Sequence, residues 1–124
     1  MDVTPLVPRN RTLIQSYGNG RFVVADTPYE GSVILTKESI IDWSINKIEE
    51  LSNILLEEII QCQSNADLLL LGTGKTQTFP PKPMLEMLRA AGLVVEVMDT
   101  GAACRTYNVL LAEERAVMAA LIAV

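Results

Sequence analysis

The sequence contains no histidine. Histidine is the commonest general base in enzymes, so its absence excludes Ser-His and Cys-His catalytic pairs. The two cysteines, Cys62 and Cys104, stand 42 positions apart, which in a chain without histidine argues against a structural zinc site. So few cysteines, with no signal peptide, are typical of a reducing compartment. We therefore expect no metal and no cofactor.

Long apolar runs and clusters of positive charge are missing as well. The formal net charge is -5, and no two basic residues are adjacent, which argues against nucleic acid or an acidic membrane surface as the partner. No apolar run approaches the length of a transmembrane segment. The opening MDVTPLVPRNRTL lacks the apolar centre of a signal peptide and the arginine-rich pattern of a mitochondrial address. We therefore expect a cytoplasmic protein.

The residues that are present suffice for one domain. The chain has 124 residues, and 49% of them are hydrophobic, which is enough for a single core. No repeat, linker or low-complexity segment interrupts it. The sequence predicts one α/β domain over residues 1–124.

The first part of the chain predicts β-structure. Residues 27–31 (TPYEG) have the composition of a turn, and Trp43 is expected to pack in the core. A Gly-Asn-Gly turn separates the first two β-rich runs and predicts a hairpin. The expected strands cover 12–17, 21–25, 32–36 and a short segment near 40–45.

The remainder alternates helices and strands. The sequence predicts a helix from Leu51, a strand over 67–72, a helix over 83–92, a strand over 93–99 and a helix over 100–114. Thr100 is a possible cap of the last helix. The inner face expected for the first helix consists of Leu51, Ile54, Leu55, Ile59 and Cys62. Residues 115–124 fit a strand or a helix, and we favour a strand because a terminal apolar run must be buried. Strand, helix and strand in succession predict neighbouring parallel strands.

The stretch LLLLGTGKTQTFPP (68–81) imitates a phosphate-binding loop. That loop needs a glycine five positions before the glycine of the GKT triplet, and this position is Leu69. The loop must also run directly into a helix, whereas Pro80 and Pro81 follow shortly after Lys75. The sequence therefore favours a glycine turn that closes a buried strand over a nucleotide-binding site.

The stretch VVEVMDTGAA (94–103) imitates the aspartic-protease motif. In a retroviral-type protease two such aspartates share a proton across a dimer axis. Only 23 residues follow Gly101, too few for the strands and flap of that fold. We interpret Asp99 as the end of a parallel strand, where a carboxylate is favoured by the positive end of the following helix.

Both turns are expected at the carboxyl edge of the sheet, where open α/β sheets bind ligands. Backbone N–H groups with a lysine and an arginine could hold a carboxylate or phosphate there. The alternative is that the glycines only permit tight turns, while Arg105 pairs with Asp99 or caps carbonyls. The candidate anion-binding residues are Gly72, Thr73, Gly74, Lys75, Gly101 and Arg105.

Four further residues are candidates for function: Asp99, Cys104, Tyr107 and Asn108. Cys104 is expected in the first turn of a helix beside Arg105, and both features lower the pKa of a thiol. Small neighbours favour burial instead. Tyr107 could donate a proton and Asn108 could orient a carbonyl, or both could be buried groups that tie the helix to a turn.

The segments GTGKTQTFPP (72–81) and EVMDTGAACRTYNVLLAEER (96–115), at this separation, resemble a small family of domains of unknown function. Its eukaryotic relatives include the mitochondrial respiratory complex I assembly factor 3 and an adipogenesis-associated protein. The resemblance extends over nearly the whole chain. It implies a three-layer α/β fold with a mixed central sheet and an N-terminal β-hairpin layer, but no reaction. The absence of a transit segment favours a bacterial cytoplasm.

Three function classes follow from these observations. The first is a non-catalytic interaction or assembly factor with a protein partner, which could also self-associate into a homo-oligomer. The second is a small-anion binding protein that uses the crevice between the two glycine turns. The third, and least supported, is a thiol enzyme that uses Cys104.

Overall fold

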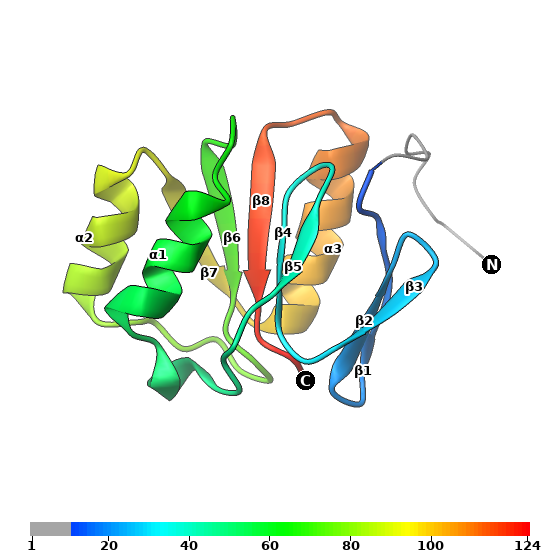
Figure 1. Ribbon diagram of the computed structural model, residues 1–124, viewed down its shortest axis with the longest axis horizontal. Coiled ribbons are helices and arrows are strands. Elements are labelled where there is room, and N and C mark those ends of the chain that lie inside the picture. The colour runs from blue at the N-terminus through cyan, green and yellow to red at the C-terminus, as the bar shows by residue number, and fades with distance from the viewer. Residues whose placement is uncertain (1–10) are drawn as a thin grey trace.

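The computed structural model describes residues 11–124 (Figure 1). Its strands are β1 (Ile14–Gly18), β2 (Arg21–Val24), β3 (Thr27–Glu30), β4 (Val33–Leu35), β5 (Ile40–Asp42), β6 (Leu68–Gly72), β7 (Val94–Met98) and β8 (Val117–Leu121). Its helices are α1 (Asn53–Gln61), α2 (Lys82–Ala90), α3 (Thr100–Ala112) and a 3-10 turn, η1 (Ile48–Glu50).

The central sheet has five strands in the order β5-β4-β8-β6-β7. Strand β6 is parallel to both β7 and β8, and β4 is antiparallel to β5 and β8, so the sheet is mixed as predicted. The open choice for the end of the chain is settled as a strand: β8 lies in the middle of the sheet, and its five residues are buried. An apolar run covered on both faces has this property.

Two apolar cores lie on opposite faces of this sheet, which gives the predicted three layers (Figure 1). Helices α1 and α2 cover one face, where Leu69 and Leu71 of β6 point. Helix α3 and the sheet formed by β1, β2 and β3 cover the other face, where Leu70 points. Alternate residues of one strand therefore serve different cores.

The N-terminal hairpin forms as predicted, but the expected turn over 27–31 is wrong. Residues Thr27–Glu30 are strand β3, and the chain reverses one step earlier, at Ala25 and Asp26, which have φ of 48° and 67°. The side chain of Gln15 bonds to Asp26 twice, accepting from its backbone N–H at 2.6 Å and donating to its carboxylate at 2.7 Å. These bonds support a backbone conformation that L-residues rarely adopt.

The predicted inner face of the first helix is also partly wrong. Helix α1 begins after Ser52, whose hydroxyl accepts from the N–H of Leu55, so Leu51 precedes the helix. Ile54 is 77% exposed, and the fully buried positions are Leu56 and Ile59. Adjacent apolar pairs fit several helical faces equally well, so periodicity alone did not select the right one. Trp43 is buried as expected, and its indole N–H donates to the carbonyl of Leu55 at 3.2 Å.

Candidate functional site

The two motif turns meet at the carboxyl edge of the sheet, where β6 and β7 end. The N–H of Thr100 donates to the carbonyl of Gly74 at 2.8 Å, and the N–H of Gly74 donates to the hydroxyl of Thr100 at 2.9 Å. The N–H of Thr73 donates to the carbonyl of Met98 at 2.9 Å. The predicted neighbourhood of the two turns is therefore confirmed, and the backbone N–H groups of Gly74 and Thr100 are already occupied.

The hydroxyl of Thr100 joins three strand ends. It is fully buried, and besides accepting from Gly74 it donates to the carbonyl of Ile122 at 2.7 Å, just after β8. The N–H of Ile122 in turn donates to the carbonyl of Gly72 at 2.9 Å. We refer to Gly72, Gly74, Thr100 and Ile122 as the strand-end clasp.

The expected capping role of Thr100 is wrong, because Asp99 is the N-cap of α3. Its carboxylate accepts from the N–H of Ala102 at 2.9 Å, as an N-cap aspartate does. The interpretation of Asp99 as a strand-ending carboxylate at the positive end of a helix is confirmed. The helix follows the strand at once, so Thr100 is its first residue and can turn its hydroxyl towards the strands.

The glycines of the two motifs are required for different structural reasons. A β-carbon on Gly72 would lie 3.0 Å from Leu121 Cδ2 and 3.1 Å from the Cα of Thr100. Gly74 has φ of +110°, which L side chains rarely adopt. A β-carbon on Gly101 would lie 2.9 Å from the hydroxyl of Tyr17. Close approach explains the first and third glycines, and backbone conformation explains the second.

The loop after β6 is braced by its own side chains. The hydroxyl of Thr73 donates to the carbonyl of Thr76 at 2.7 Å and accepts from the N–H of Thr78 at 3.0 Å. The amide of Gln77 donates to the carbonyl of Val97 at 2.9 Å, on β7. Helix α2 begins only at Lys82, so the lysine of the GKT triplet is not at a helix start. The structure therefore agrees with the rejection of a phosphate-binding loop.

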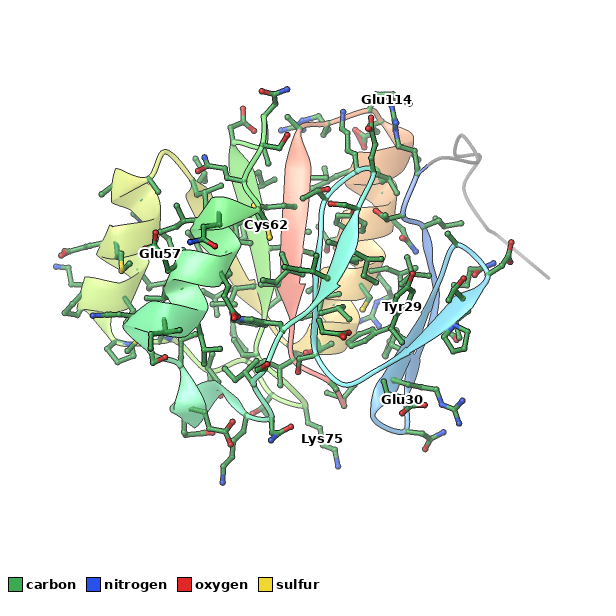
Figure 2. All side chains as sticks on the ribbon, in the orientation of Figure 1. Tyr29, Glu30, Glu57, Cys62, Lys75 and Glu114 are labelled. Carbon is green, nitrogen blue, oxygen red and sulfur yellow. The ribbon has the colours of Figure 1, made fainter. Side chains whose placement is uncertain are left out.

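The candidate anion-binding residues fall on two sides of the clasp. Lys75 is exposed and extends away from the lower edge in Figure 2. Together with Lys47 and Thr73 it lines a cavity of about 210 Å³ between the 73–78 loop and residues 46–49. Neither Gly101 nor Arg105 lines this cavity.

Arg105 lies on the side of the N-terminal sheet. Its Nη1 donates to the hydroxyl of Tyr17 at 2.6 Å, over Gly101. The alternative that Arg105 pairs with Asp99 or caps carbonyls is not what the described residues show: Arg105 donates to Tyr17, and the carboxylate of Asp99 caps α3. Tyr17 was missed by sequence reasoning because it is 88 positions from Arg105. No local pattern relates the two residues.

Cys104 is buried, as the small neighbours indicate, with 1% of its surface exposed. It is the fifth residue of α3 and not part of the first turn, so that expectation is wrong. Burial raises the pKa of the Cys104 thiol to about 12, against the opposing charge of Arg105. The thiol is therefore protonated at neutral pH, unlike a reactive cysteine.

Tyr107 and Asn108 join α3 to the preceding β-structure by hydrogen bonds, in line with the alternative that they are structural and not catalytic. The hydroxyl of Tyr107 lies 2.6 Å from that of Thr12 and 3.0 Å from the carbonyl of Thr36. Burial raises the pKa of Tyr107 to about 12. The amide of Asn108 accepts from the N–H of Ile14 at 2.9 Å and donates to its carbonyl at 2.7 Å, so the partner is strand β1 and not a turn.

The class of protein is a small mixed α/β domain whose two motif turns are hydrogen-bonded at one edge of the sheet. Within residues 11–124 no group of three or more histidine, cysteine, aspartate or glutamate side chains is placed to hold a metal. In the same residues no helix is both long and apolar enough to cross a bilayer.

Residues 14–122 match the protein family described as a protein of unknown function (DUF498/DUF598), and the chain belongs to this family. It is 29% identical over 109 residues to the 13 kDa major membrane protein of Francisella tularensis, covering 87% of this chain and 88% of that one. It is 31% identical to the bovine NADH dehydrogenase (ubiquinone) 1 alpha subcomplex assembly factor 3 over 110 residues. That match covers 88% of this chain but only 59% of the bovine protein. The expected resemblance is confirmed.

Among solved structures, the fold is similar to that of a protein described as an outer membrane protein from Bartonella henselae. The TM-score is 0.83 at 34% sequence identity, and the match covers 95% of this chain and 98% of the other. The three-layer fold implied by the resemblance is thus confirmed.

We expect Gly72→Ala to destabilise the protein by about 1–3 kcal/mol, because the added methyl group meets the backbone of Thr100, which cannot move without opening the clasp. Gly101→Ala is the matched control. Its methyl group meets the hydroxyl end of Tyr17 and the end of Arg105, two side chains that can turn away at the cost of one exposed hydrogen bond. Urea unfolding of both variants measures the difference. Equal losses would contradict the clasp as the cause.

The free energy of unfolding should fall as the pH rises above 9. The unfolded chain loses the Cys104 proton near pH 9, whereas the folded protein keeps it until about pH 12. Between pH 8 and pH 10 this difference removes about 1 kcal/mol of stability. Urea unfolding at the two pH values measures it. Cys104→Ala should show a smaller loss over this interval, and an identical loss would refute the assignment.

Proposed function

We propose that this protein is a non-catalytic interaction factor that binds another protein during the assembly of a multi-subunit complex. The curated relatives that carry a functional name are assembly factors, and this supports the proposal. Because the chain spans only 59% of the bovine relative, the proposal concerns the shared domain. The buried, protonated thiol of Cys104 and the structural bonds of Asp99, Tyr107 and Asn108 weigh against the enzyme alternative.

The observation that carries the proposal is the exposure of Phe79 on a braced loop. Phe79 is 65% exposed, and it directly follows the segment that the Thr73 and Gln77 side chains hold in place. A large aromatic side chain that is already held in position loses little conformational entropy on binding, which is characteristic of interface hot spots. Ile54, 77% exposed, is the second residue of α1, which begins at the same lower end of the molecule (Figure 1).

A location beside a membrane complex fits this role. The Francisella and Bartonella relatives are described as membrane proteins, yet residues 11–124 contain no helix able to span a bilayer. We propose that the protein acts from the bacterial cytoplasm as a peripheral partner of such a complex. A subunit of an NADH dehydrogenase is the partner to which the name of the assembly-factor relatives points.

Replacing Phe79 by a photo-cross-linking phenylalanine analogue should capture one dominant partner protein in the native cell. The matched control is the analogue at Val109, which is 53% exposed on α3. The adducts are identified by mass spectrometry, and the expected one is a subunit of a multi-subunit complex. Phe79→Ala should weaken binding to that purified subunit by about tenfold or more. Its stability should change by less than about 0.5 kcal/mol, because the side chain is exposed.

The same adducts at both positions, or none at Phe79, would contradict the proposed surface. An adduct with a second copy of this chain alone would assign Phe79 to a homo-oligomer instead.

The second candidate function is small-anion binding at the carboxyl edge. It is favoured by the cavity of about 210 Å³, which is lined by two exposed lysines, Lys47 and Lys75. The anion site proposed here keeps Thr73, Gly74 and Lys75 from the six candidate residues, adds Lys47, and leaves out Gly72, Gly101 and Arg105, which do not line the cavity.

Phosphate should raise the melting temperature more than chloride does at equal ionic strength. Lys75→Ala should abolish this difference, because it removes one of the two cations. Lys82→Ala, which removes an exposed lysine outside the cavity, should leave it unchanged. Loss of the effect in both variants would indicate general charge screening and refute the site.

A further inference from the structure

A second cavity lies at the opposite edge of the central sheet. Its volume is about 330 Å³, within the range of small-molecule sites. Three connections form it: the segment after β4, the loop between α1 and β6, and the residues that lead into β8. The residues of these connections that line it include Lys37, Asn65 and Ala116, and Arg11 completes the lining. These segments lie at the upper edge of the sheet in Figure 1, away from the clasp.

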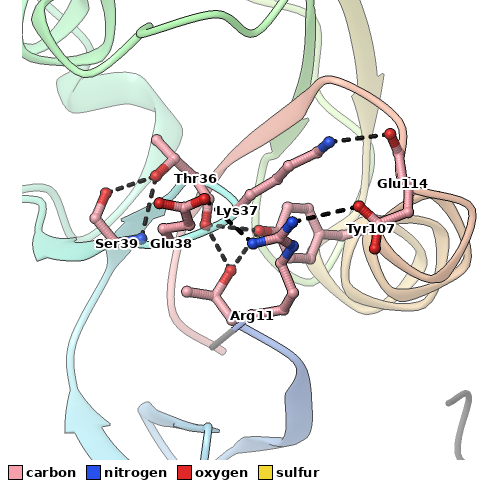
Figure 3. Close-up of polar contacts among 8 residues, drawn as sticks. Arg11, Thr36, Lys37, Glu38, Ser39, Tyr107 and Glu114 are labelled. Carbon is pink, nitrogen blue, oxygen red and sulfur yellow. Dashed lines mark hydrogen bonds and ion pairs between the residues drawn. The ribbon is translucent and has the colours of Figure 1, made fainter. Parts of the chain in front are cut away.

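The charged side chains of this cavity are Arg11, Lys37 and Glu38, so its lining carries one net positive charge in a protein whose net charge is -5. Arg11 has only 16% of its side chain exposed. Its Nη1 lies 3.2 Å from the carboxylate of Glu38, and its Nη2 lies 3.3 Å from that of Glu114 (Figure 3). These two carboxylates are 70% and 53% exposed, so each pair is weakened by water.

The guanidinium of Arg11 is not fully paired. Its Nε atom is buried and has no hydrogen-bond partner among residues 11–124. An unpaired buried donor costs free energy, so a group that accepts a hydrogen bond from it is favoured. A planar carboxylate presents the two acceptors that a guanidinium fork accommodates. Such a group could accept from Nε together with one of the two Nη atoms.

The cation pair is held in position before any ligand binds. The ammonium group of Lys37 donates to the carbonyl of Glu114 at 2.9 Å (Figure 3). On the neighbouring residue, the carbonyl of Thr36 accepts from the hydroxyls of Thr12 and Tyr107. Glu114 therefore positions both cations, one through its carboxylate and one through its backbone.

Two residues at this cavity have backbone conformations that usually require glycine. Ser64, in the lining, has φ of 50°, and Glu114 has φ of 60°. The other non-glycine residues with positive φ in the described chain, Asn19, Ala25 and Asp26, all lie in hairpin turns. The end of α3 explains the conformation of Glu114: the N–H of Arg115 donates to the carbonyl of Leu110 at 3.0 Å and that of Glu114 to the carbonyl of Leu111 at 3.1 Å, as in a Schellman cap.

We propose that this cavity binds a small monocarboxylic acid. Its carboxylate would accept from Nε and one neighbouring Nη atom of Arg11, where it would displace a glutamate carboxylate, and would lie beside Lys37. Ser64 and Asn65, on the loop between α1 and β6, supply hydroxyl and amide groups that can bond to a polar substituent of the acid, such as a hydroxyl group. The lining has one net positive charge, which suits one carboxylate once the Glu114 carboxylate has left Arg11, and Glu38 disfavours an ion with two negative charges.

The probe is 3-hydroxybutyrate, and its control is 3-hydroxybutyramide, which has nearly the same size but no charge. In an NMR titration of the wild-type protein the acid should shift the backbone amide signals of Ser64, Asn65 and Ala66 saturably, with a dissociation constant on the order of 1 mM. The amide should give no saturable shift, because it cannot form the charged bonds with Arg11.

Two variants should change the affinity in opposite directions. Arg11→Gln should weaken binding by about tenfold or more, since it removes the charged donor. Glu38→Gln should tighten binding by roughly threefold, because it removes a carboxylate that competes for Arg11. Arg89→Gln, a change to an exposed arginine on α2, should leave the affinity unchanged. Unchanged signals from β6 and β8 verify that each variant is folded.

Three results would overturn the inference. The first is the absence of a saturable shift with 3-hydroxybutyrate up to about 20 mM, well above the expected constant. The second is equal binding of the neutral amide or of inorganic phosphate, which would remove the preference for a carboxylate. The third is weaker binding in both Arg11→Gln and Glu38→Gln, which would point to a loss of structure instead of a loss of recognition.

Discussion

The structure depends on the reciprocal hydrogen bonds between Gly74 and Thr100. They join the turn after β6 to the start of α3, and the hydroxyl of Thr100 extends the link to the carbonyl of Ile122 after β8. Gly72, Thr100 and Ile122 are buried and Gly74 is partly buried, so a missing bond at Thr100 would leave its hydroxyl unpaired away from water. The motifs that imitate a nucleotide-binding loop and a protease active site are therefore explained by the need to close one edge of a sheet.

This closure separates two parts of the molecule that can bind. On the side of the clasp, the loop that follows Thr73 is held by side-chain bonds and presents Phe79 and Lys75 outwards. At the far edge, loops that are also held by hydrogen bonds, such as that from the Gln63 side chain to the carbonyl of Ala66 at 3.2 Å, surround a polar cavity lined by Arg11 and Lys37. A rigid central sheet lies between them, so a protein partner at one end and a small acid at the other would not compete for the same surface.

Much of the architecture could be predicted from local patterns. Continuous apolar runs such as 67–72 indicated strands covered on both faces, and strand, helix and strand in succession indicated parallel neighbours. These patterns predicted that the turn near residue 73 and the turn near residue 100 lie side by side, and the structure confirms it. Two errors have different origins: adjacent apolar pairs in α1 fit several helical faces, and the turn at Ala25 and Asp26 depends on bonds to Gln15, on the strand before it.

The sequence by itself determined the class of fold, the burial of Cys104 and the exclusion of histidine chemistry, because these depend on residue type and spacing along the chain. Only the tertiary structure decided which polar groups are free. The N–H groups of Gly74 and Thr100 are used within the clasp, Arg105 donates to Tyr17, and Arg11 Nε has no partner among residues 11–124. Hydrogen bonds join groups that folding brings within about 3 Å of each other, whatever their separation in the chain, so their pattern is a property of the folded molecule.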